Sequence, residues 1–395
     1  MNNRIIKIEI QEHRLVIKFP FFKLSFKIDN VPYNNVLKDL ESYVIANNQL
    51  KKHICNLEND ISSLRTQYFD FLCEDFLYKH FNPLKKRRLF ITTGLISLIN
   101  AMAIIKDLDN TNYQNFLIIS SANISEDFKK YNEQLLLDNY FKSFAFVDYE
   151  IINSLSKHFN QFEEIYTTAQ PVYNFWNNYS NINLIEEGIS SYYSYEEINY
   201  ANVQKIYLSN YFDKITYFDS DNIDKVVRLD KNIIKNVISD IRQKNNLDFK
   251  YLKKENQVLL LSQYVYQDIM SDDEVVMFYK KHIDKLIKNG YSVLFKSHPR
   301  VHDTITNRLV EIYKENSMFS FFPPEIKYPV ELIIEDLDLK AIVTSASGGA
   351  INCSHLFDIP CYGFGANLIR QNHSFENVRR NAEVFINSVQ SIKNM

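Results

Sequence analysis

The stretch YSVLFKSHPR, residues 291–300, joins a run of apolar residues to a short polar group. Short apolar runs with polar ends are typical of strands buried in a parallel sheet. The polar group contains Lys296, His298 and Arg300, and Pro299 fixes the backbone directly after the histidine. Open α/β sheets bind ligands at the carboxyl ends of their strands. The stretch therefore predicts either a cationic ligand site at a sheet edge or, more simply, a helix-capping turn.

Similar apolar runs alternate with helical stretches from residue 88 onward, in two series separated by the amphipathic segment NIIKNVISDIRQKNN. Strand and helix alternating twice over predict an α/β protein with two Rossmann-like domains facing a central cleft. We place these domains at 85–250 and 251–395. The runs of the first series include RLFITTG (88–94), NFLIIS (115–120), SFAFVD (143–148), EEIYTT (163–168) and INLIEEG (182–188), and those of the second include QVLLLSQ (257–263) and KAIVTSASGG (340–349).

Two further segments precede these domains. Residues 4–29 alternate apolar and polar residues, which predicts a β hairpin or meander within a segment 1–35. Within the segment 36–84, apolar residues at 40–64 follow a heptad spacing with Asn47 at one a position. This pattern favours a parallel coiled-coil dimer. The alternative is an amphipathic helix packed within its own subunit.

The composition excludes several classes of protein. The chain has 395 residues, 46% hydrophobic and 24% charged, as in globular proteins that fold in water. A net charge of −3 argues against a dedicated nucleic-acid binder. The four cysteines have no CxxC spacing and indicate neither a zinc site nor a disulfide framework, so we expect a cytoplasmic protein. The basic cluster KKRR at 85–88 is expected to be a solvated surface, with anionic lipid as the alternative partner.

An acidic pair follows the run INLI of the first series. Glu186 and Glu187 repel each other there, so the less solvated one can acquire a raised pKa and act as a general base. Gly188 allows a sharp backbone turn and leaves room for a ligand. The alternative is an acidic pair that caps the next helix. The residues alone do not choose between the two carboxylates.

Hydroxyl and glycine residues end the run KAIV of the second series. Thr344, Ser345, Ser347 and Gly348 lead into an expected helix near Ala350. Backbone N–H groups and serine hydroxyls at a helix N-terminus form an anion site. The spacing matches neither a P-loop nor a dinucleotide fingerprint. Simple capping without a ligand is the alternative.

The order of these three groups resembles the bacterial sialyltransferases of GT-B fold, which include lipooligosaccharide and capsule enzymes and polysialyltransferases. Their signatures are an acidic-acidic-Gly triplet, an HP motif and a Ser/Thr-Ser motif, matched here by 186–188, 298–299 and 344–347. Glu331, in YPVELII, stands where the family has a carboxylate that binds the nucleotide ribose. The resemblance covers residues 88–365. It departs from the family where TSASGG interrupts the adjacent hydroxyl pair, which leaves the phosphate to Ser345 or Ser347.

The resemblance implies an inverting transfer of sialic acid, or a related nonulosonic acid, from a CMP-activated donor to a hydroxyl of a surface glycan. Glu186, or Glu187 in its place, would deprotonate the acceptor, and His298 would assist the departing CMP phosphate. Neither a metal nor a cofactor is implied, since a single phosphate leaves and protein donors can stabilise it. The donor-binding residues would be Lys296, Pro299, Glu331, Thr344, Ser345, Ser347 and Gly348.

Partners follow from the same resemblance. They are CMP-sialic acid, a glycan acceptor, either free or lipid-linked, and a second copy of the chain bound through the 40–64 helix. A peripheral position at the inner face of the bacterial inner membrane is also implied. A polysialic acid elongating transferase is an alternative within the family.

Two readings lie outside the family. A metal-dependent transferase of nucleoside diphosphate sugars would use a DxD motif, and the chain has three, at 107–109, 219–221 and 336–338. A non-catalytic coiled-coil scaffold with a degenerate body is the other. Survival of activity in EDTA excludes the first, and thermal stabilisation by CMP excludes the second.

Overall fold

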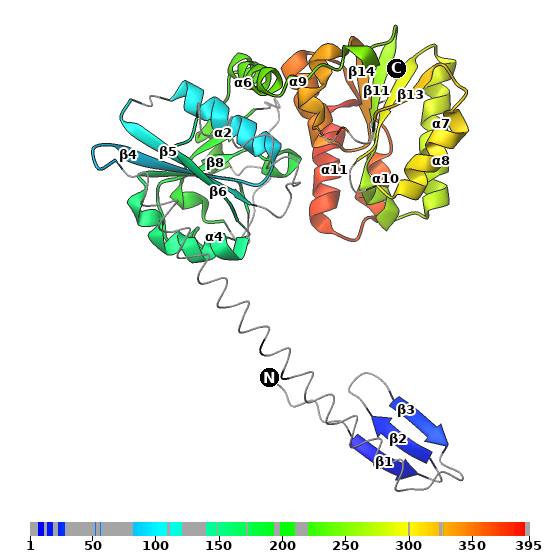
Figure 1. Cartoon of the computed structure of the whole chain (residues 1–395), viewed down its shortest axis with the longest axis horizontal. Helices are drawn as coiled ribbons and strands as arrows, with labels where there is room; N and C mark the ends of the chain where they lie inside the picture. The colour runs from blue at the N-terminus through cyan, green and yellow to red at the C-terminus, as the bar shows by residue number, and fades with distance from the viewer. Residues whose placement is uncertain are drawn as a thin grey trace. The chain divides into compact units, whose positions relative to one another are not determined.

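The computed structural model of the chain divides into two compact units, residues 1–71 and residues 72–395 (Figure 1). In the first unit it describes the backbone of three strands, together with residues 52 and 56. In the second unit it describes 82–391, except for 109–110, 121–139, 148, 171–172, 193–197, 210–219, 299–300, 324–325 and 327. The heptad stretch at 40–64 falls almost entirely outside the described residues, so the coiled coil and the dimer stay predictions.

The three strands of the first unit form an antiparallel meander, in the order β1-β2-β3. The alternation of residues 4–29 predicted such an element. The strands are β1 (Lys7–Gln11), β2 (Arg14–Lys18) and β3 (Lys23–Lys27).

The first sheet of the second unit has seven parallel strands in the order β10-β9-β8-β7-β4-β5-β6. Strand β4 lies between β5 and β7, so the chain reverses its direction of winding between β4 and β7. This is the switch point at which open α/β sheets bind ligands. The strands are β4 (Lys86–Thr92), β5 (Tyr113–Ser120), β6 (Ser143–Val147), β7 (Glu164–Thr167), β8 (Ile182–Ile185), β9 (Val203–Leu208) and β10 (Val226–Arg228).

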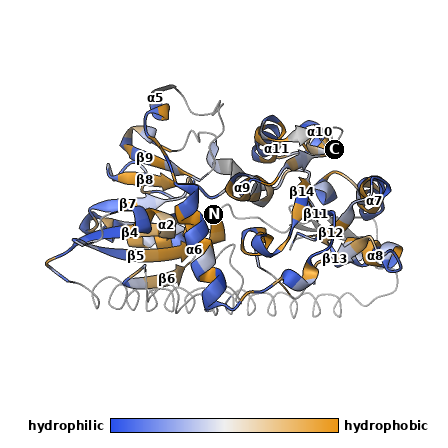
Figure 2. Ribbon diagram, turned by 90° about the horizontal axis from the view of Figure 1, so that it is seen from above, coloured by the Kyte–Doolittle hydropathy of each residue, from blue (hydrophilic) through white to orange (hydrophobic). Residues whose placement is uncertain are grey.

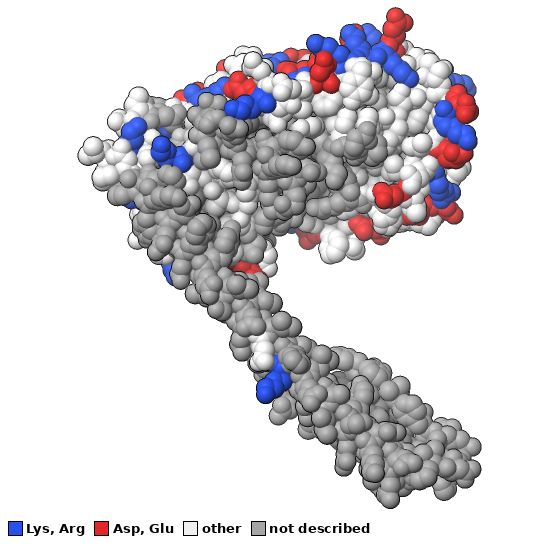
Figure 3. All heavy atoms as spheres, in the orientation of Figure 1, with Lys and Arg blue, Asp and Glu red and all other residues white. Residues whose placement is uncertain are grey.

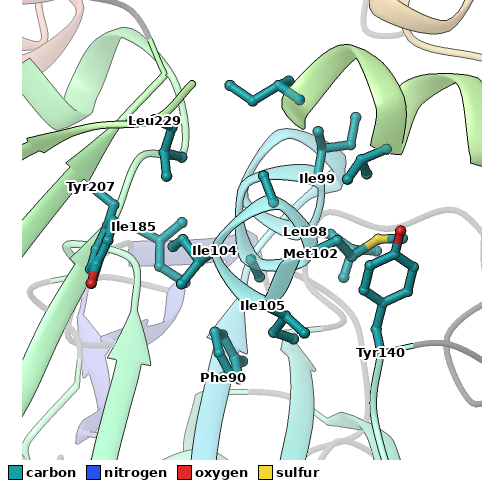
Figure 4. Close-up of a cluster of buried hydrophobic side chains, with 14 of the residues drawn as sticks. Phe90, Leu98, Ile99, Met102, Ile104, Ile105, Tyr140, Ile185, Tyr207 and Leu229 are labelled. Atoms are coloured by element: carbon teal, nitrogen blue, oxygen red, sulfur yellow. The ribbon is translucent and has the colours of Figure 1, made fainter. Parts of the chain in front are cut away.

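Helix α2 (Leu95–Asp107) covers one face of this sheet, and its buried side chains pack on the strands (Figure 4). Below it, the rings of Phe90 and Tyr166 stack with centroids 4.5 Å apart. The cluster KKRR is only partly the solvated surface that we expected. The Arg88 side chain is 5% exposed and pairs with Glu164 at 2.7 Å. The two residues are neighbours across the adjacent strands β4 and β7.

The second sheet has six parallel strands in the order β13-β12-β11-β14-β15-β16. Its switch point lies between β11 and β14. Alternate residues of β11 point to opposite faces, so Val258 packs under one layer of helices and Leu259 under the other. The strands are β11 (Gln257–Leu261), β12 (Ser292–Lys296), β13 (Phe319–Phe321), β14 (Leu339–Thr344), β15 (Cys361–Gly363) and β16 (Gln390–Ser391).

Amphipathic helices cover both faces of the second sheet. In Figure 2, α7 and α8 carry hydrophilic and hydrophobic residues on different sides. Helix α7 begins with a capping box between Ser271 and Glu274, which fixes its start. The outer surfaces of α7 and α8 carry mixed charges (Figure 3), including the ion pair of Lys280 with Asp284. The helices are α7 (Asp272–Lys288), α8 (Asp303–Tyr313), α9 (Gly348–Phe357), α10 (Ala366–Asn372) and α11 (Glu376–Ser388).

Helix α6 (Lys231–Lys244) belongs to both halves of the second unit. Its buried face, which includes Val237 and Ile241, shares one hydrophobic cluster with α2 and with Leu332 and Leu356 of the second half. The Arg242 guanidinium pairs with Asp336 at 2.6 Å. The remaining helical segments among the described residues are α4 (Tyr149–Leu155), α5 (Ser220–Ile223), η3 (Ser156–Gln161), η4 (Ile189–Tyr192), η5 (Tyr200–Asn202), η6 (Lys250–Leu252), η7 (Tyr264–Asp268), η8 (Val330–Leu332) and η9 (Ile334–Asp336).

Numbered within each sheet, the second sheet has the strand order 3-2-1-4-5-6 of the Rossmann fold, and the first sheet has the same order with one further strand, β10, at its edge. The predicted fold class, α/β with two Rossmann-like domains as in GT-B proteins, is therefore confirmed. Among the described residues, no helix has the length and apolar character needed to cross a membrane.

Candidate functional site

Glu186 follows β8 and is 1% exposed. Its Oε2 accepts hydrogen bonds from the backbone N–H of Ser209 at 2.6 Å and from the Ser209 hydroxyl at 2.7 Å. Ser209 directly follows β9, and Asn100 of α2 donates to the Glu186 carbonyl at 3.1 Å. The first acid of the triplet thus ties the end of β8 to β9 and α2. It is a buried acceptor within the fold.

Glu187 is half-buried and lies at the switch point of the first sheet. Its Oε2 accepts from the hydroxyl of Thr93 at 2.9 Å and from the Nε2 amide of Gln170 at 2.6 Å. Thr93 follows β4 and Gln170 follows the end of β7, the two strands between which the winding reverses. The second acid of the triplet therefore occupies the place where this fold binds ligands.

The glycine of the triplet has the backbone conformation that was expected. Gly188 has a backbone φ of +136°, a value that residues other than glycine rarely adopt. The turn is completed by the Glu187 N–H, which donates to the Ser191 hydroxyl at 2.9 Å. Ser191 lies in η4, and η4 contacts α11 of the second half. The segment that carries the triplet therefore leads directly to the second domain.

Lys296 ends β12 and lies half-buried in the second domain. Its Nζ stands 4.7 Å from the centroid of the Phe322 ring, a cation–π contact. Burial lowers the pKa of Lys296 to about 8, and the nearby charge of Glu331 opposes this shift. A lysine of this kind gains or loses its charge close to neutral pH.

His298 lies two residues beyond β12. Its backbone N–H donates to the hydroxyl of Ser262, after β11, at 2.7 Å, and its ring centroid lies 5.0 Å from that of Tyr264. Lys296 and His298 line one cavity of about 230 Å³, together with the half-buried ring of Phe321. Pro299, next in the predicted motif, lies outside the described residues. The cavity at these strand ends thus contains two of the predicted side chains, together with the carboxylate-bearing Asp303.

Glu331, in η8, is 2% exposed. Its Oε1 accepts from the Asn352 amide of α9 at 3.1 Å, and a Cβ at Gly349 would lie 3.2 Å from that oxygen. Burial raises the pKa of Glu331, while the Asn352 hydrogen bond and the charge of Lys296 oppose the rise. The Glu331 carboxylate, which the sequence predicted to bind a ribose, is therefore packed against the first turn of α9.

The hydroxyl motif after β14 divides into residues with different roles. The Thr344 hydroxyl donates to the Leu261 carbonyl of β11 at 3.0 Å and so joins two strands. The Ser345 hydroxyl is fully buried close to the phenols of Tyr266 and Tyr279, and it lowers the pKa of both, against the larger effect of burial. Ser347 is the half-buried N-cap of α9, and Gly348 begins that helix. Of the two serines that the sequence offered, Ser345 lies at the switch point of the second sheet and Ser347 lies at the start of α9.

Some residues of the site could not be recognised from the sequence. Thr93 stood at the end of a predicted strand, but nothing near it in the sequence pointed to a carboxylate partner. Gln170 and Ser262 had no motif at all. Gln170 and Ser262 reach partners that follow a neighbouring strand, and Thr93 reaches a partner two strands away, because parallel strands end at the same edge. Which strand ends lie close together depends on strand order.

No group of three or more metal-binding side chains occurs in the described part of the chain. In the motif at 336–338, Asp336 also accepts from the Phe249 N–H at 2.7 Å, in addition to its ion pair with Arg242. Asp338 pairs with Lys253 at 3.4 Å. These carboxylates hold the segment to its surroundings. The other two DxD motifs each include an aspartate outside the described residues.

No family model and no curated protein matches the sequence. Solved structures match the chain at low identity. A UDP-GlcNAc 2-epimerase from Methanocaldococcus jannaschii in complex with UDP-GlcNAc and UDP is 15% identical, with 77% of this chain and 91% of that chain covered and a TM-score of 0.49. The wall teichoic acid polymerase TagF is 11% identical, with 84% and 81% covered and a TM-score of 0.42. The E. coli ADP-heptose lps heptosyltransferase II is 11% identical, with 70% and 84% covered and a TM-score of 0.35.

Proposed function

We propose that this protein is an inverting, metal-independent glycosyltransferase that moves sialic acid, or a related nonulosonic acid, from a CMP-activated donor to a hydroxyl of a surface glycan. The observation that carries the proposal is the half-buried Glu187 carboxylate at the switch point of the first sheet. The order of the triplet, HP and serine motifs along the chain supports the choice of donor.

The acceptor base is Glu187 in this proposal. A general base must reach the proton that it removes, and Glu187 is half-buried at a ligand-binding edge. Glu186 is 1% exposed, and its Oε2 is bound to Ser209. We therefore assign Glu186 to holding the loop and Glu187 to the proton transfer.

The second domain binds the donor. Lys296 contributes positive charge to the cavity, and His298 stabilises or protonates the leaving phosphate. The hydroxyl of Ser345, with Ser347 and Gly348 at the start of α9, would complete the phosphate contacts.

The reaction balances without an outside reagent. The acceptor oxygen attacks the anomeric carbon while Glu187 takes its proton. The bond from that carbon to the CMP phosphate oxygen breaks, and its electron pair leaves with CMP. The configuration at the anomeric carbon inverts in this single displacement.

A donor screen tests the proposal. CMP-sialic acid, CMP-Kdo and UDP-sugars are compared by donor hydrolysis and by thermal shift. Stabilisation of about 2.7 kcal/mol is expected from a ligand at one hundred times its Kd. Stabilisation and turnover by CMP-sialic acid support the proposal. A protein that responds only to UDP-sugars, or that loses turnover in EDTA, contradicts it.

Two partners belong to the same proposal. The acceptor is a glycan, either free or lipid-linked at the inner membrane face, and repeated transfer onto a growing chain would make the enzyme a polysialyltransferase. The heptads at 40–64 would pair two subunits. Light scattering of Ile54→Glu tests the pairing: conversion of a dimer to a monomer supports it, and an unchanged mass argues for a helix packed within the subunit.

A further inference from the structure

The carboxylate of Glu187 is bound by two neutral donors on one oxygen. Thr93 donates from the end of β4 and Gln170 from the end of β7, at 2.9 Å and 2.6 Å. Hydrogen bonds to an ionised carboxylate favour its charged form. Because the donors belong to the two strands that flank the switch point, they also fix where the carboxylate lies.

The turn that carries Gln170 is itself held in place. The indole N–H of Trp176 donates to the Gln170 carbonyl at 2.9 Å, and the Gln170 N–H donates to the Thr168 carbonyl at 2.9 Å. Trp176 is 2% exposed and packs against the ring of Phe175, with centroids 5.3 Å apart. A buried aromatic anchor thus determines the position of the amide that reaches Glu187.

Two titratable neighbours of Glu187 in the described part of the chain have other roles. Burial raises the pKa of Tyr173, and the charge of Glu187 raises it further, so this phenol stays neutral at physiological pH. Glu186 is bound to Ser209.

We propose that Gln170 and Thr93 are positioning residues that keep the Glu187 carboxylate ionised and in one orientation for proton transfer, with Trp176 anchoring Gln170. The inference rests on the proposed function, in which Glu187 is the acceptor base. Neither residue belongs to the three motifs of the sequence.

The first measurement needs no turnover. Protein labelled with ¹³C at glutamate Cδ is titrated by NMR, and the Glu187 signal is identified by its loss in Glu187→Gln. Loss of one hydrogen bond to the ionised group in Gln170→Ala or Thr93→Val should raise the titration midpoint by about one pH unit. Thr93→Ser keeps the hydroxyl and should titrate like the unmodified protein.

A matched control is available on the same sheet. Gln204 of β9 is exposed, and its Nε2 donates to the Ser180 carbonyl at 2.8 Å, so Gln204→Ala should leave the midpoint unchanged. Emission from Trp176, the single tryptophan of the chain, reports whether the turn keeps its fold in each variant. Should Gln170→Ala disturb that emission, Thr93→Val still tests the inference, because Thr93 follows a different strand, β4.

The second measurement is the pH dependence of kcat. In Gln170→Ala and Thr93→Val the acid limb should move to higher pH, and kcat at neutral pH should fall about tenfold with the donor KM unchanged. Raising the pH should then restore kcat, which a merely structural defect would not allow. An unchanged Glu187 midpoint in both variants overturns the inference. A shifted midpoint without turnover of any CMP-sugar supports the role of Gln170 and Thr93 in holding Glu187 ionised, and contradicts the proposed function together with the proton transfer.

Discussion

The two Rossmann-like sheets share a strand order and differ in the charge at their carboxyl edges. The first edge presents the Glu187 carboxylate, held by a hydroxyl and an amide. The second presents the Lys296 ammonium above an aromatic ring, with His298 in the same cavity. One topology therefore holds different charged groups at the carboxyl edges of its two copies. The residues that follow each strand, and not the fold, decide which partner each edge receives.

The sharpest test of this comparison separates the two adjacent acids of the first edge. Glu187→Gln should lower kcat by on the order of 10²-fold to 10⁴-fold, because it removes the general base. Its melting temperature should change little, since Thr93 and Gln170 keep a side-chain oxygen as acceptor. Steady-state kinetics and calorimetry measure the two quantities.

Glu186→Gln is the matched variant. It weakens the acceptor for the two Ser209 donors and should lower the free energy of unfolding by about 1–3 kcal/mol. Its kcat should fall less than that of Glu187→Gln. The reverse ranking of kcat would give the base role to Glu186.

On the second edge, His298→Ala should lower turnover of the CMP-activated donor by on the order of 10²-fold, as expected for lost leaving-group assistance. The backbone N–H that binds Ser262 remains, so the variant should stay folded. His302→Ala, at an exposed histidine four residues further along the chain, is the control. Near-complete activity in His298→Ala would remove the HP motif from the mechanism.

The charge of Lys296 should make CMP binding pH-dependent. The pKa near 8 means that the ammonium is present below pH 8 and is lost above it, so CMP affinity should fall by up to about tenfold per pH unit above that value. Calorimetric titrations at several pH values measure this fall. Lys296→Met should bind CMP weakly and without this dependence, whereas Lys314→Met, at an exposed ion pair, should retain it.

The Lys296 ammonium affects the stability of the fold with a pH dependence opposite to that of CMP affinity. The folded-state pKa of Lys296 lies below its ordinary value of 10.5, so the unfolded chain binds more protons between about pH 8 and 10.5. The contribution of Lys296 to stability therefore rises with pH across this window. Falling stability from this residue over the same range would contradict its burial.

The smallest expected effect distinguishes the two hydroxyls after β14. Ser345→Ala should weaken CMP binding by about twofold to tenfold, because it removes a hydroxyl that we propose contacts the phosphate. Thr344→Val should cost about 1 kcal/mol of stability and leave CMP affinity unchanged, because its hydroxyl binds the Leu261 carbonyl. Equal CMP affinities for Ser345→Ala and the unmodified protein would leave the phosphate to Ser347 and the start of α9.

The sequence predicted the fold class well because buried parallel strands leave continuous apolar runs, such as LLL in β11 and LII in β5. It also found the strand ends that carry the triplet and the HP motif. It did not choose between Glu186 and Glu187, since that choice depends on β9 lying on one side of β8 and β7 on the other. For the same reason it missed Gln170, whose distance from Glu187 is set by strand order.

Burial was the second property that the sequence did not reveal. Nothing in the sequence indicated that the Glu331 carboxylate is buried against Asn352 and the first turn of α9, and its contact with a ribose stays a prediction. Arg88 was placed with a solvated basic cluster, yet it pairs with Glu164 inside the sheet edge. In both cases a charged side chain is stabilised by a partner far away in sequence, and residue spacing carries no record of such partners.

Helix α6 has a consequence for how this molecule comes apart. Its apolar face shares one core with α2 and with Leu332 and Leu356 of the second half. Exposing that face removes apolar contacts from both halves together, and Arg242 would lose its aspartate partner in the same event. Residues 72–395 should therefore melt in one cooperative transition, with neither half surviving as a separately folded fragment.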